Sequence, residues 1–334
     1  MLRTALFGMG GIGTHLAQEI TDHPHATLAA AVDVNSEQLA VASRDFDVDE
    51  SALFTDVEEM YAEISSLDAV VIATPPVFHY ERIVEAFERG LHVLCEKPVV
   101  MNREEACGVL ELVESSSQTL MAGYQRHLNP GFIEAYERWH ESGREPTFIT
   151  GELTQDWTGH FEAGTNWRTD PEIGGGGHLF SVGTHVVESI LWMTGLTPEW
   201  VTAEMDFYDD DQHIDKQAAL TVRFDNGAIA CLGDSAMTPA TREHIHVWDD
   251  DGAVYLEGKE WGRRELTLLD ERGTDVTPEV NYDNAQGKFE AFVTAIRTNA
   301  KPPATAKDVL RVTALLETAY ESAREGRRVA VNLD

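Results

Sequence analysis

A lysine at the end of a predicted strand is the residue of this chain best placed for chemistry. The chain has six lysines against 19 arginines. One of them, Lys97, follows the apolar run from Leu91 to Cys95 and lies between Glu96 and Pro98. In open α/β sheets, ligands bind outside the carboxyl ends of the strands. A lone Lys-Pro pair more often begins a surface loop, so the surrounding residues must decide between the two interpretations.

A glycine-rich loop lies directly after the first predicted strand, where a predicted helix begins. Its sequence, Gly8-Met9-Gly10-Gly11-Ile12-Gly13, satisfies the pattern G-x-G-x-x-G. The glycines allow a tight turn and close approach of the backbone, so a pyrophosphate can rest on the amino end of the helix. The second predicted strand ends at Asp33, whose carboxylate can bind a ribose 2′-hydroxyl. This combination predicts a dinucleotide site.

Asp33 also bears on the choice of cofactor. A carboxylate there would repel the 2′-phosphate of NADP, and Val34-Asn35-Ser36 offers no arginine to bind one. The sequence therefore favours NAD, with NADP as the alternative. Asp33 could equally cap a helix or close a turn, and it could serve both roles.

Strand-like and helix-like patterns alternate over the first 125 residues, which indicates parallel strands joined by helices. The predicted strands are Thr4–Phe7, Thr27–Val32, Ala69–Ala73, His92–Cys95 and Leu120–Tyr124. The predicted helices between them are Ile12–Ile20, Phe78–Arg89 and Glu104–Glu114.

The pattern changes after Tyr124. Period-two alternation dominates from Val201 to Leu269, and Asp225-Asn226-Gly227 is a strong hairpin signal. Further elements are predicted at Phe132–Trp139, Thr147–Trp157, Leu179–Met193, Phe289–Arg297 and Asp308–Arg324. We predict an α/β protein with a Rossmann domain over residues 1–122, a doubly wound parallel sheet. An α+β domain with a large, mostly antiparallel open sheet follows over 123–334, and its last helices are free to pack back on the first domain.

The chain is strongly acidic. Asp and Glu total 58 against 25 Lys and Arg, for a net charge of −33. Nucleic acids and anionic membranes call for basic patches, so neither is an expected partner. Dispersed acids with few lysines predict a halophilic protein of a salt-rich cytoplasm, although an ordinary acidic enzyme is the alternative. The three cysteines match neither a disulfide framework nor a zinc cluster, and no signal peptide or membrane span is recognised.

Taken together, the motifs resemble the Gfo/Idh/MocA family of NAD(P)-dependent sugar and cyclitol oxidoreductases over nearly the whole chain. The resemblance rests on the glycine loop, Ala73-Thr74-Pro75-Pro76 with His79, Glu96-Lys97-Pro98, Gly123-Tyr124-Gln125-Arg126 with Asn129-Pro130, Trp167-Arg168, Gly175-Gly176-Gly177, Gly183-Thr184-His185, and the closing helix with Ser322 and Gly326. It implies cofactor-binding roles for Gly8, Gly10, Gly11, Ile12, Gly13, Asp33, Thr74, Pro75, His79, Glu96, Lys97, Arg126, Trp167 and Arg168.

The same resemblance implies the catalytic residues. In that family the lysine of Glu-Lys-Pro reaches the nicotinamide and the reacting oxygen, with the histidine of Gly-x-His opposite it. An aspartate commonly precedes this histidine by four residues. Here Ser181 takes that place ahead of His185. Residues four apart share the face of an α-helix, so the expected geometry is kept while a carboxylate is lost.

Hydride transfer from an alcohol needs a base for the hydroxyl proton and positive charge near the developing alkoxide. An imidazole titrates near neutral pH, so we assign the acid/base role to His185 and the polarising role to Lys97. Ser181 is assigned as a hydrogen-bonding orienter. The alternative for His185 is a packed helix histidine.

Substrate contacts are predicted from Lys97, His185, Arg168, Trp157 and His178. His178 lies seven residues before His185, on much the same face of an α-helix, and is expected in a supporting role. Trp157 is expected to stack on a sugar together with His160 and Trp167, although such aromatics more often belong to a core. No metal site is predicted.

The leading hypothesis is an NAD-dependent dehydrogenase of a sugar, sugar acid or cyclitol, in the form of a homodimer or homotetramer. A closely related alternative prefers NADP or runs mainly as a keto-sugar reductase. A second is a dinucleotide-binding regulator without turnover, which Ser181 would favour. A third is NAD-dependent glycoside cleavage, in which the bound cofactor is recycled.

Overall fold

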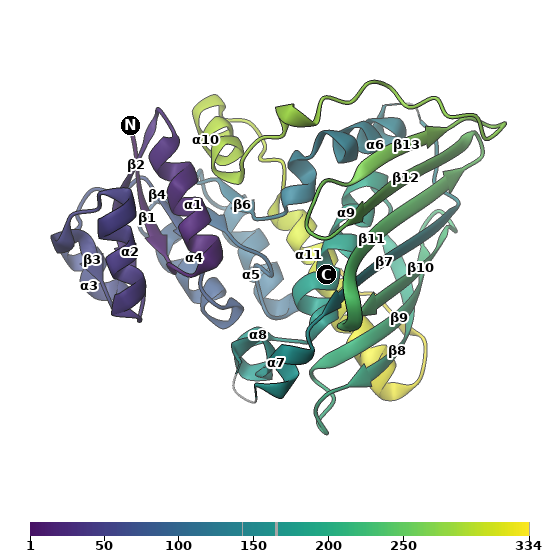
Figure 1. Cartoon of the computed structure of the whole chain (residues 1–334), viewed down its shortest axis with the longest axis horizontal. Helices are drawn as coiled ribbons and strands as arrows, with labels where there is room; N and C mark the ends of the chain where they lie inside the picture. Colours follow the sequence, from purple (N-terminus) through teal and green to yellow (C-terminus); the bar gives the residue numbers. More distant parts are fainter. Residues whose placement is uncertain (142, 164–165, 334) are drawn as a thin grey trace. The chain divides into compact units, whose positions relative to one another are not determined.

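Short apolar strands separated by amphipathic helices form the first of two structural units. The computed structural model describes residues 1–141, 143–163 and 166–333 and is drawn in Figure 1. Unit 1 comprises residues 1–100, 104–125 and 286–306, and unit 2 comprises 101–103, 126–285 and 307–334. Within the described residues, no helix is both long enough and apolar enough to cross a membrane.

Unit 1 contains a parallel six-stranded sheet with the order β3-β2-β1-β4-β5-β6. Its strands are β1 Leu2–Phe7, β2 Ala26–Val32, β3 Leu53–Phe54, β4 Ala69–Ile72, β5 His92–Cys95 and β6 Leu120–Ala122. Its helices are α1 Gly11–Asp22, α2 Ser36–Phe46, α3 Val57–Glu63, α4 His79–Glu88, α5 Arg103–Glu114 and α10 Lys288–Thr298. The predicted Rossmann architecture is confirmed.

The strand order of unit 1 reverses between β1 and β4, and ligands bind at such a switch point. β4 is a continuous run of buried β-branched and small residues, which is typical of a parallel strand covered on both faces. The loops that leave β1 and β4 begin at Gly8 and Ala73. The switch point therefore brings the glycine loop beside Thr74 and Pro75.

Unit 2 contains an eight-stranded sheet with the order β13-β12-β11-β7-β10-β9-β8-β14. Its strands are β7 Phe148–Asp156, β8 Pro198–Phe207, β9 Asp215–Phe224, β10 Ile229–Ser235, β11 Met237–Asp249, β12 Gly252–Lys259, β13 Glu265–Leu269 and β14 Val329–Ala330. Its α-helices are α6 Pro130–His140, α7 Thr158–Glu162, α8 Pro171–Gly174, α9 Thr184–Thr194 and α11 Ala306–Glu325. All of these strand pairs are antiparallel except β7 with β10, so the predicted sheet is confirmed.

Helices cover one face of this sheet. In Figure 1, α6 and α9 lie over the strands of unit 2, and α9 contacts β7 and β11. The long helix α11 is tied to β8, because the Ala203 N–H donates to Ser322 Oγ at 3.0 Å. The predicted hairpin at Asp225-Asn226-Gly227 joins β9 to β10, and Gly227 adopts a φ of +90° there.

One predicted helix differs from the structure. The segment expected to be a single α-helix from Leu179 to Met193 begins as a π-helix, Leu179–Gly183, and continues as α9. A buried carboxylate caps the start of this segment, since the Leu179 N–H donates to Asp215 Oδ2 at 2.9 Å. Such π segments are rare and are frequently found at functional sites.

Candidate active site

The glycine loop of unit 1 combines two close backbone contacts with two open positions. Gly8 has a φ of +91°, and a Cβ there would lie 2.6 Å from the Ala73 carbonyl oxygen. A Cβ on Gly13 would lie 1.9 Å from the Gly8 carbonyl oxygen. At Gly10 and Gly11, by contrast, an added Cβ would meet no described atom within 4 Å. Gly8 and Gly13 are therefore needed for the turn itself, whereas Gly10 and Gly11 leave space in front of it.

The amino end of α1 faces this space without a protein cap. Gly10 is the N-cap residue and supplies no side-chain hydrogen bond, and the first turn holds no acidic residue. Helices present unpaired N–H groups and partial positive charge at this end, so it fits a pyrophosphate. Ile12, in the same turn, is exposed.

Asp33 anchors the loop from the end of β2. Its Oδ2 accepts the Met9 N–H at 2.7 Å, and its Oδ1 accepts the Asn35 N–H at 2.8 Å. A carboxylate has about four acceptor sites, so both oxygens can still receive a ribose hydroxyl. The residue thus holds the glycine loop in place and remains able to bind a ribose.

His79 joins the two loops that follow β4 and β5. The buried ring lies 2.7 Å from the Thr74 carbonyl oxygen through Nε2 and 2.8 Å from the Pro98 carbonyl oxygen through Nδ1. Burial lowers the pKa of this imidazole. Both ring nitrogens therefore lie within hydrogen-bond distance of the backbone of these loops, and a contact of His79 with the cofactor stays a prediction.

The side chain of the adjoining Thr74 indicates where a ligand could bind in unit 1. Its Oγ1 is buried and has no hydrogen-bond partner among the described residues. Pro75 follows as the N-cap of a 3₁₀ turn, Pro76–Phe78. An unsatisfied hydroxyl beside the uncapped amino end of α1 is consistent with a bound dinucleotide, so these residues fit the cofactor that the fold implies.

Lys97 follows a glutamate that is held by a second lysine. The buried Glu96 pairs through Oε1 with Lys288 Nζ of α10, and its Oε2 accepts the Lys97 N–H at 3.3 Å. Gly123 admits this carboxylate, since a Cβ there would lie 3.1 Å from it. Lys288 was not predicted as a site residue, although lysine is as rare at that position as at Lys97.

Ser181 and His185 lie in the helical segment of unit 2, but not on a regular α-helix. Ser181 is in the π-helix, where its N–H donates to the Gly177 carbonyl at 3.0 Å, and His185 is in the first turn of α9. A π-helix has more residues per turn than an α-helix. The expected single α-helix is therefore interrupted between His178 and His185, and a shared face for Ser181 and His185 stays a prediction. Both side chains are buried, and the His185 ring lies 6.1 Å from that of Trp261.

His178 is the centre of a buried polar group. Its Nδ1 lies 2.7 Å from Asp234 Oδ2, and the Trp157 ring packs edge to face at 4.9 Å. Trp157 is only 3% exposed, and its Nε1 donates to Gln155 Oε1 at 3.0 Å. This burial does not favour the predicted stacking of Trp157 on a sugar and makes it a wall of the His178 site.

Trp167 and Arg168 form a stacked pair on a 3₁₀ turn, Trp167–Thr169. The Arg168 Cζ lies 4.3 Å above the Trp167 ring, and the Arg168 N–H donates to Asn166 Oδ1 at 3.1 Å. Burial lowers the pKa of the guanidinium. A Cβ on Gly174 would lie 2.8 Å from the Trp167 carbonyl oxygen, so this glycine is needed for the packing.

Comparison with known proteins places the chain in a family. Residues 2–124 match the Gfo/Idh/MocA oxidoreductase family with an NAD-binding Rossmann fold, and residues 141–255 match the Gfo/Idh/MocA C-terminal domain. The chain belongs to the Gfo/Idh/MocA family. This family membership confirms the resemblance inferred from the motifs and identifies the chain as an oxidoreductase.

Proteins similar to this chain cover most or nearly all of its length. It is 28% identical to D-xylose 1-dehydrogenase (NADP(+)) 2 of Haloferax volcanii, over 98% of this chain and 99% of that protein. It is 24% identical to a scyllo-inositol 2-dehydrogenase (NADP(+)) of Bacillus subtilis, over 79% of each chain. The solved structure of aldose-aldose oxidoreductase from Caulobacter crescentus shares the fold, with a TM-score of 0.84, 21% identity and coverage of 98% and 99% of the two chains.

One residue of the family pattern pairs with a buried carboxylate of unit 2. Arg126 was predicted to bind the cofactor, but it is buried and pairs through Nη2 with Glu243 Oε2 in unit 2. The same oxygen accepts Arg264 Nη2 at 2.6 Å. The Arg126 guanidinium thus pairs with a buried carboxylate through Nη2, and its cofactor-binding role stays a prediction.

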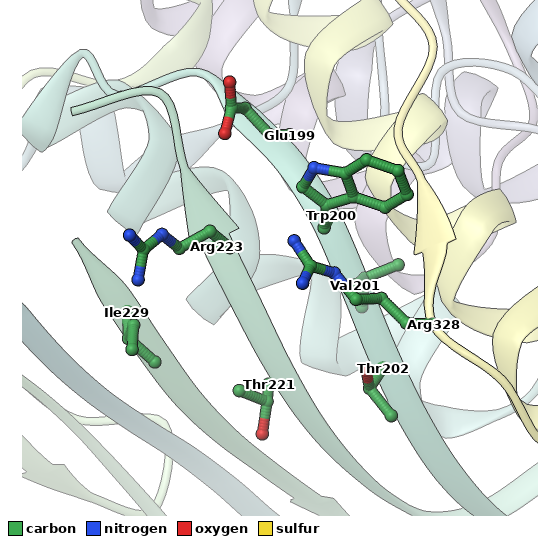
Figure 2. Close-up of a pocket in the computed structure, with 8 residues that line it drawn as sticks. All are labelled: Glu199, Trp200, Val201, Thr202, Thr221, Arg223, Ile229 and Arg328. Atoms are coloured by element: carbon green, nitrogen blue, oxygen red, sulfur yellow. The ribbon is translucent and has the colours of Figure 1, made fainter. Parts of the chain in front are cut away.

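A shallow groove on the exposed face of the large sheet lies apart from these residues. Figure 2 shows Trp200 and Arg328 together there, with the Arg328 Cζ 4.5 Å above the Trp200 ring. The residues that line the groove include none of those predicted for cofactor, substrate or catalysis. Across the described chain, no cluster of three or more histidine, cysteine or acidic side chains is arranged to hold a metal ion.

Proposed function

We propose that this oxidoreductase transfers a hydride between NAD and the hydroxyl or keto carbon of a sugar, sugar acid or cyclitol. The proposal rests on one group of features at the carboxyl edge of the sheet in unit 1. They are the uncapped amino end of α1, the open positions Gly10 and Gly11, and the Thr74 hydroxyl, which has no partner among the described residues. Thr74 follows β4, and Lys97 follows the neighbouring strand β5. The activities for which the xylose and inositol dehydrogenases above are named support the substrate class.

The chain's own residues supply charge and proton transfer. The bound nicotinamide exchanges the hydride. The ammonium of Lys97 stabilises the negative charge that develops on the substrate oxygen, and an imidazole takes the hydroxyl proton. The family pattern assigns that imidazole to His185, with Ser181 as its hydrogen-bonding neighbour. Arg168 is proposed to contact the cofactor or a substrate hydroxyl.

The preference for NAD is also a proposal. Both named relatives use NADP, according to their names. In this chain, however, the carboxylate of Asp33 occupies the end of β2, and the exposed Val34 follows it. A carboxylate favours the two hydroxyls of the NAD ribose and repels a 2′-phosphate.

We further propose a halophilic, cytoplasmic homo-oligomer. The net charge of −33 and the six lysines support adaptation to salt, and so does the likeness to a protein of Haloferax volcanii. The face of the large sheet that the helices leave exposed suits pairing with a second copy.

Replacement of Lys97 by alanine tests the proposed activity. We expect the parent to reduce NAD with at least one member of a polyol, aldose and sugar-acid panel in molar salt. Lys97→Ala should lose about 10²–10³-fold in kcat, because it removes the charge that stabilises the alkoxide. The readout is the absorbance of reduced nicotinamide, with Lys301→Ala, an exposed lysine of the same unit, as the control.

Two results would contradict this assignment. If Lys97→Ala were as active as the parent, Lys97 would have no catalytic role. If NADH bound tightly to the parent but no substrate turned over, the chain would be a dinucleotide-binding regulator.

A further inference from the structure

The carboxylate that is missing at position 181 has a counterpart on a different element. Asp234 lies on β10 and is buried. A Cβ on Gly183 would lie 2.6 Å from Asp234 Oδ1 and 2.9 Å from its carboxyl carbon. The carboxylate therefore touches the backbone midway between Ser181 and His185. Ser181 replaces the aspartate of the family pattern, but the carboxylate of Asp234 lies against the same helical segment.

Asp234 determines which nitrogen of His178 carries a proton. Its Oδ2 lies 2.7 Å from His178 Nδ1. A carboxylate only accepts hydrogen bonds, so Nδ1 must be protonated, and in the neutral ring Nε2 then holds the lone pair. An aspartate that orients a histidine in this way also stabilises the imidazolium that forms when Nε2 takes up a proton.

The free nitrogen of this pair points to an absent partner. His178 is fully buried, and its Nε2 has no hydrogen-bond partner among the described residues. Asp234 Oδ1 is unpartnered in the same sense. Leaving a buried polar atom unpaired is unfavourable, and a hydrogen bond from a substrate hydroxyl to Nε2 would remove that penalty.

The other side chains near His178 and Asp234 have partners of their own. Asp215 of β9 accepts the Tyr320 hydroxyl of α11 at Oδ1, and Tyr320 in turn accepts the Gly177 N–H at 3.1 Å. Burial, together with the charge of Asp234, raises the pKa of Asp215 to about 6. The Trp157 ring packs edge to face against the His178 ring, with 4.9 Å between the centroids. Asp215 is thus engaged in holding the glycine-rich segment, which leaves Asp234 as the carboxylate that serves His178.

We propose that the acid/base couple of this enzyme has moved from positions 181 and 185 to Asp234 and His178. The inference rests on the proposed function. In the oxidation, the substrate O–H bond breaks and its proton passes to His178 Nε2. The carbinol C–H bond breaks as hydride leaves for the oxidised nicotinamide, and the C=O bond forms. Asp234 acts as a positioning residue, His178 is the proton acceptor, and His185 contributes to substrate binding.

The decisive experiment compares His178→Gln, Asp234→Asn and His185→Gln in the full-length enzyme. We expect the first two to lose about 10²–10⁴-fold in kcat with little change in KM, together with the acidic limb of the pH profile of kcat. His185→Gln should mainly raise KM. His213→Gln, an exposed histidine of the same unit, is the matched control. Melting temperature and NADH binding should show that each variant is folded.

A second readout needs neither cofactor nor substrate. Nitrogen-15 NMR of histidine-labelled parent, assigned with His178→Gln, should show His178 protonated at Nδ1, and Asp234→Asn should alter that signal. A neutral His178 protonated at Nε2 would overturn the inference, and so would full kcat in Asp234→Asn. Loss of the acidic limb of the kcat pH profile in His185→Gln, but not in His178→Gln, would overturn it as well. An inactive parent would instead overturn the proposed function, so the two failures are distinguishable.

Discussion

Among single residues, Asp33 carries two tasks that one substitution can separate. Its oxygens accept the Met9 and Asn35 N–H groups and so hold the glycine loop. Its negative charge is what should discriminate against a 2′-phosphate. An asparagine retains one acceptor oxygen without the charge, whereas an alanine removes both.

We therefore expect Asp33→Asn to raise the ratio of kcat/KM for NADP to that for NAD by about tenfold or more, because like-charge repulsion is lost. Asp33→Ala should weaken the binding of both cofactors, since the loop loses its anchor. Fluorescence titration with NADH and NADPH provides the measurement beside the kinetics. An unchanged ratio in Asp33→Asn would remove Asp33 from cofactor selection.

At the scale of elements, hydrophobic patterns along the chain predicted the strands of unit 1. The five strands predicted in unit 1 are all present, with ends shifted by at most two residues, and the strand His92–Cys95 has the predicted bounds. The short β3 and the helices α2 and α3 were not predicted. Two-residue strands carry too little periodicity to be recognised.

The parts of the site that escaped prediction depend on partners distant in the chain. The N–H of Leu179, the first residue of the π-helix, donates to Asp215, which lies 36 residues further along the chain. Lys288 meets Glu96 across 192 residues, and Asp234 meets His178 across 56. No spacing rule links such pairs, since the fold alone brings them together. The glycine loop, by contrast, could be predicted because its chemistry is contiguous.

The structure of the glycine loop predicts different effects for alanine at Gly13 and at Gly10. Gly13→Ala should destabilise unit 1 by about 1–3 kcal/mol or more, since its Cβ would overlap the Gly8 carbonyl oxygen at 1.9 Å. Gly10→Ala should leave the melting temperature unchanged, because the position is open and its φ of −66° suits alanine. It should nevertheless weaken NADH binding by about tenfold, or about 1.4 kcal/mol. Equal melting temperatures for the two variants would contradict this division of roles.

At the scale of the whole molecule, the net charge predicts how folding should depend on salt. With a net charge of −33, mutual repulsion opposes the folded state wherever it is not screened. The Debye length falls from about 30 Å at 0.01 M salt to about 3 Å at 1 M. Repulsion between acids on different elements should therefore be strong in dilute buffer and nearly absent in molar salt.

We expect the melting temperature to rise steadily with sodium chloride and the chain to unfold near 0.01 M salt. The double variant Asp210→Asn and Asp211→Asn, at two exposed acids, should melt at a higher temperature than the parent in dilute salt and at the same temperature in molar salt. A gain at both salt concentrations would mean that local interactions, and not long-range repulsion, cause the effect. Full stability of the parent at about 0.01 M salt would contradict halophilic adaptation altogether.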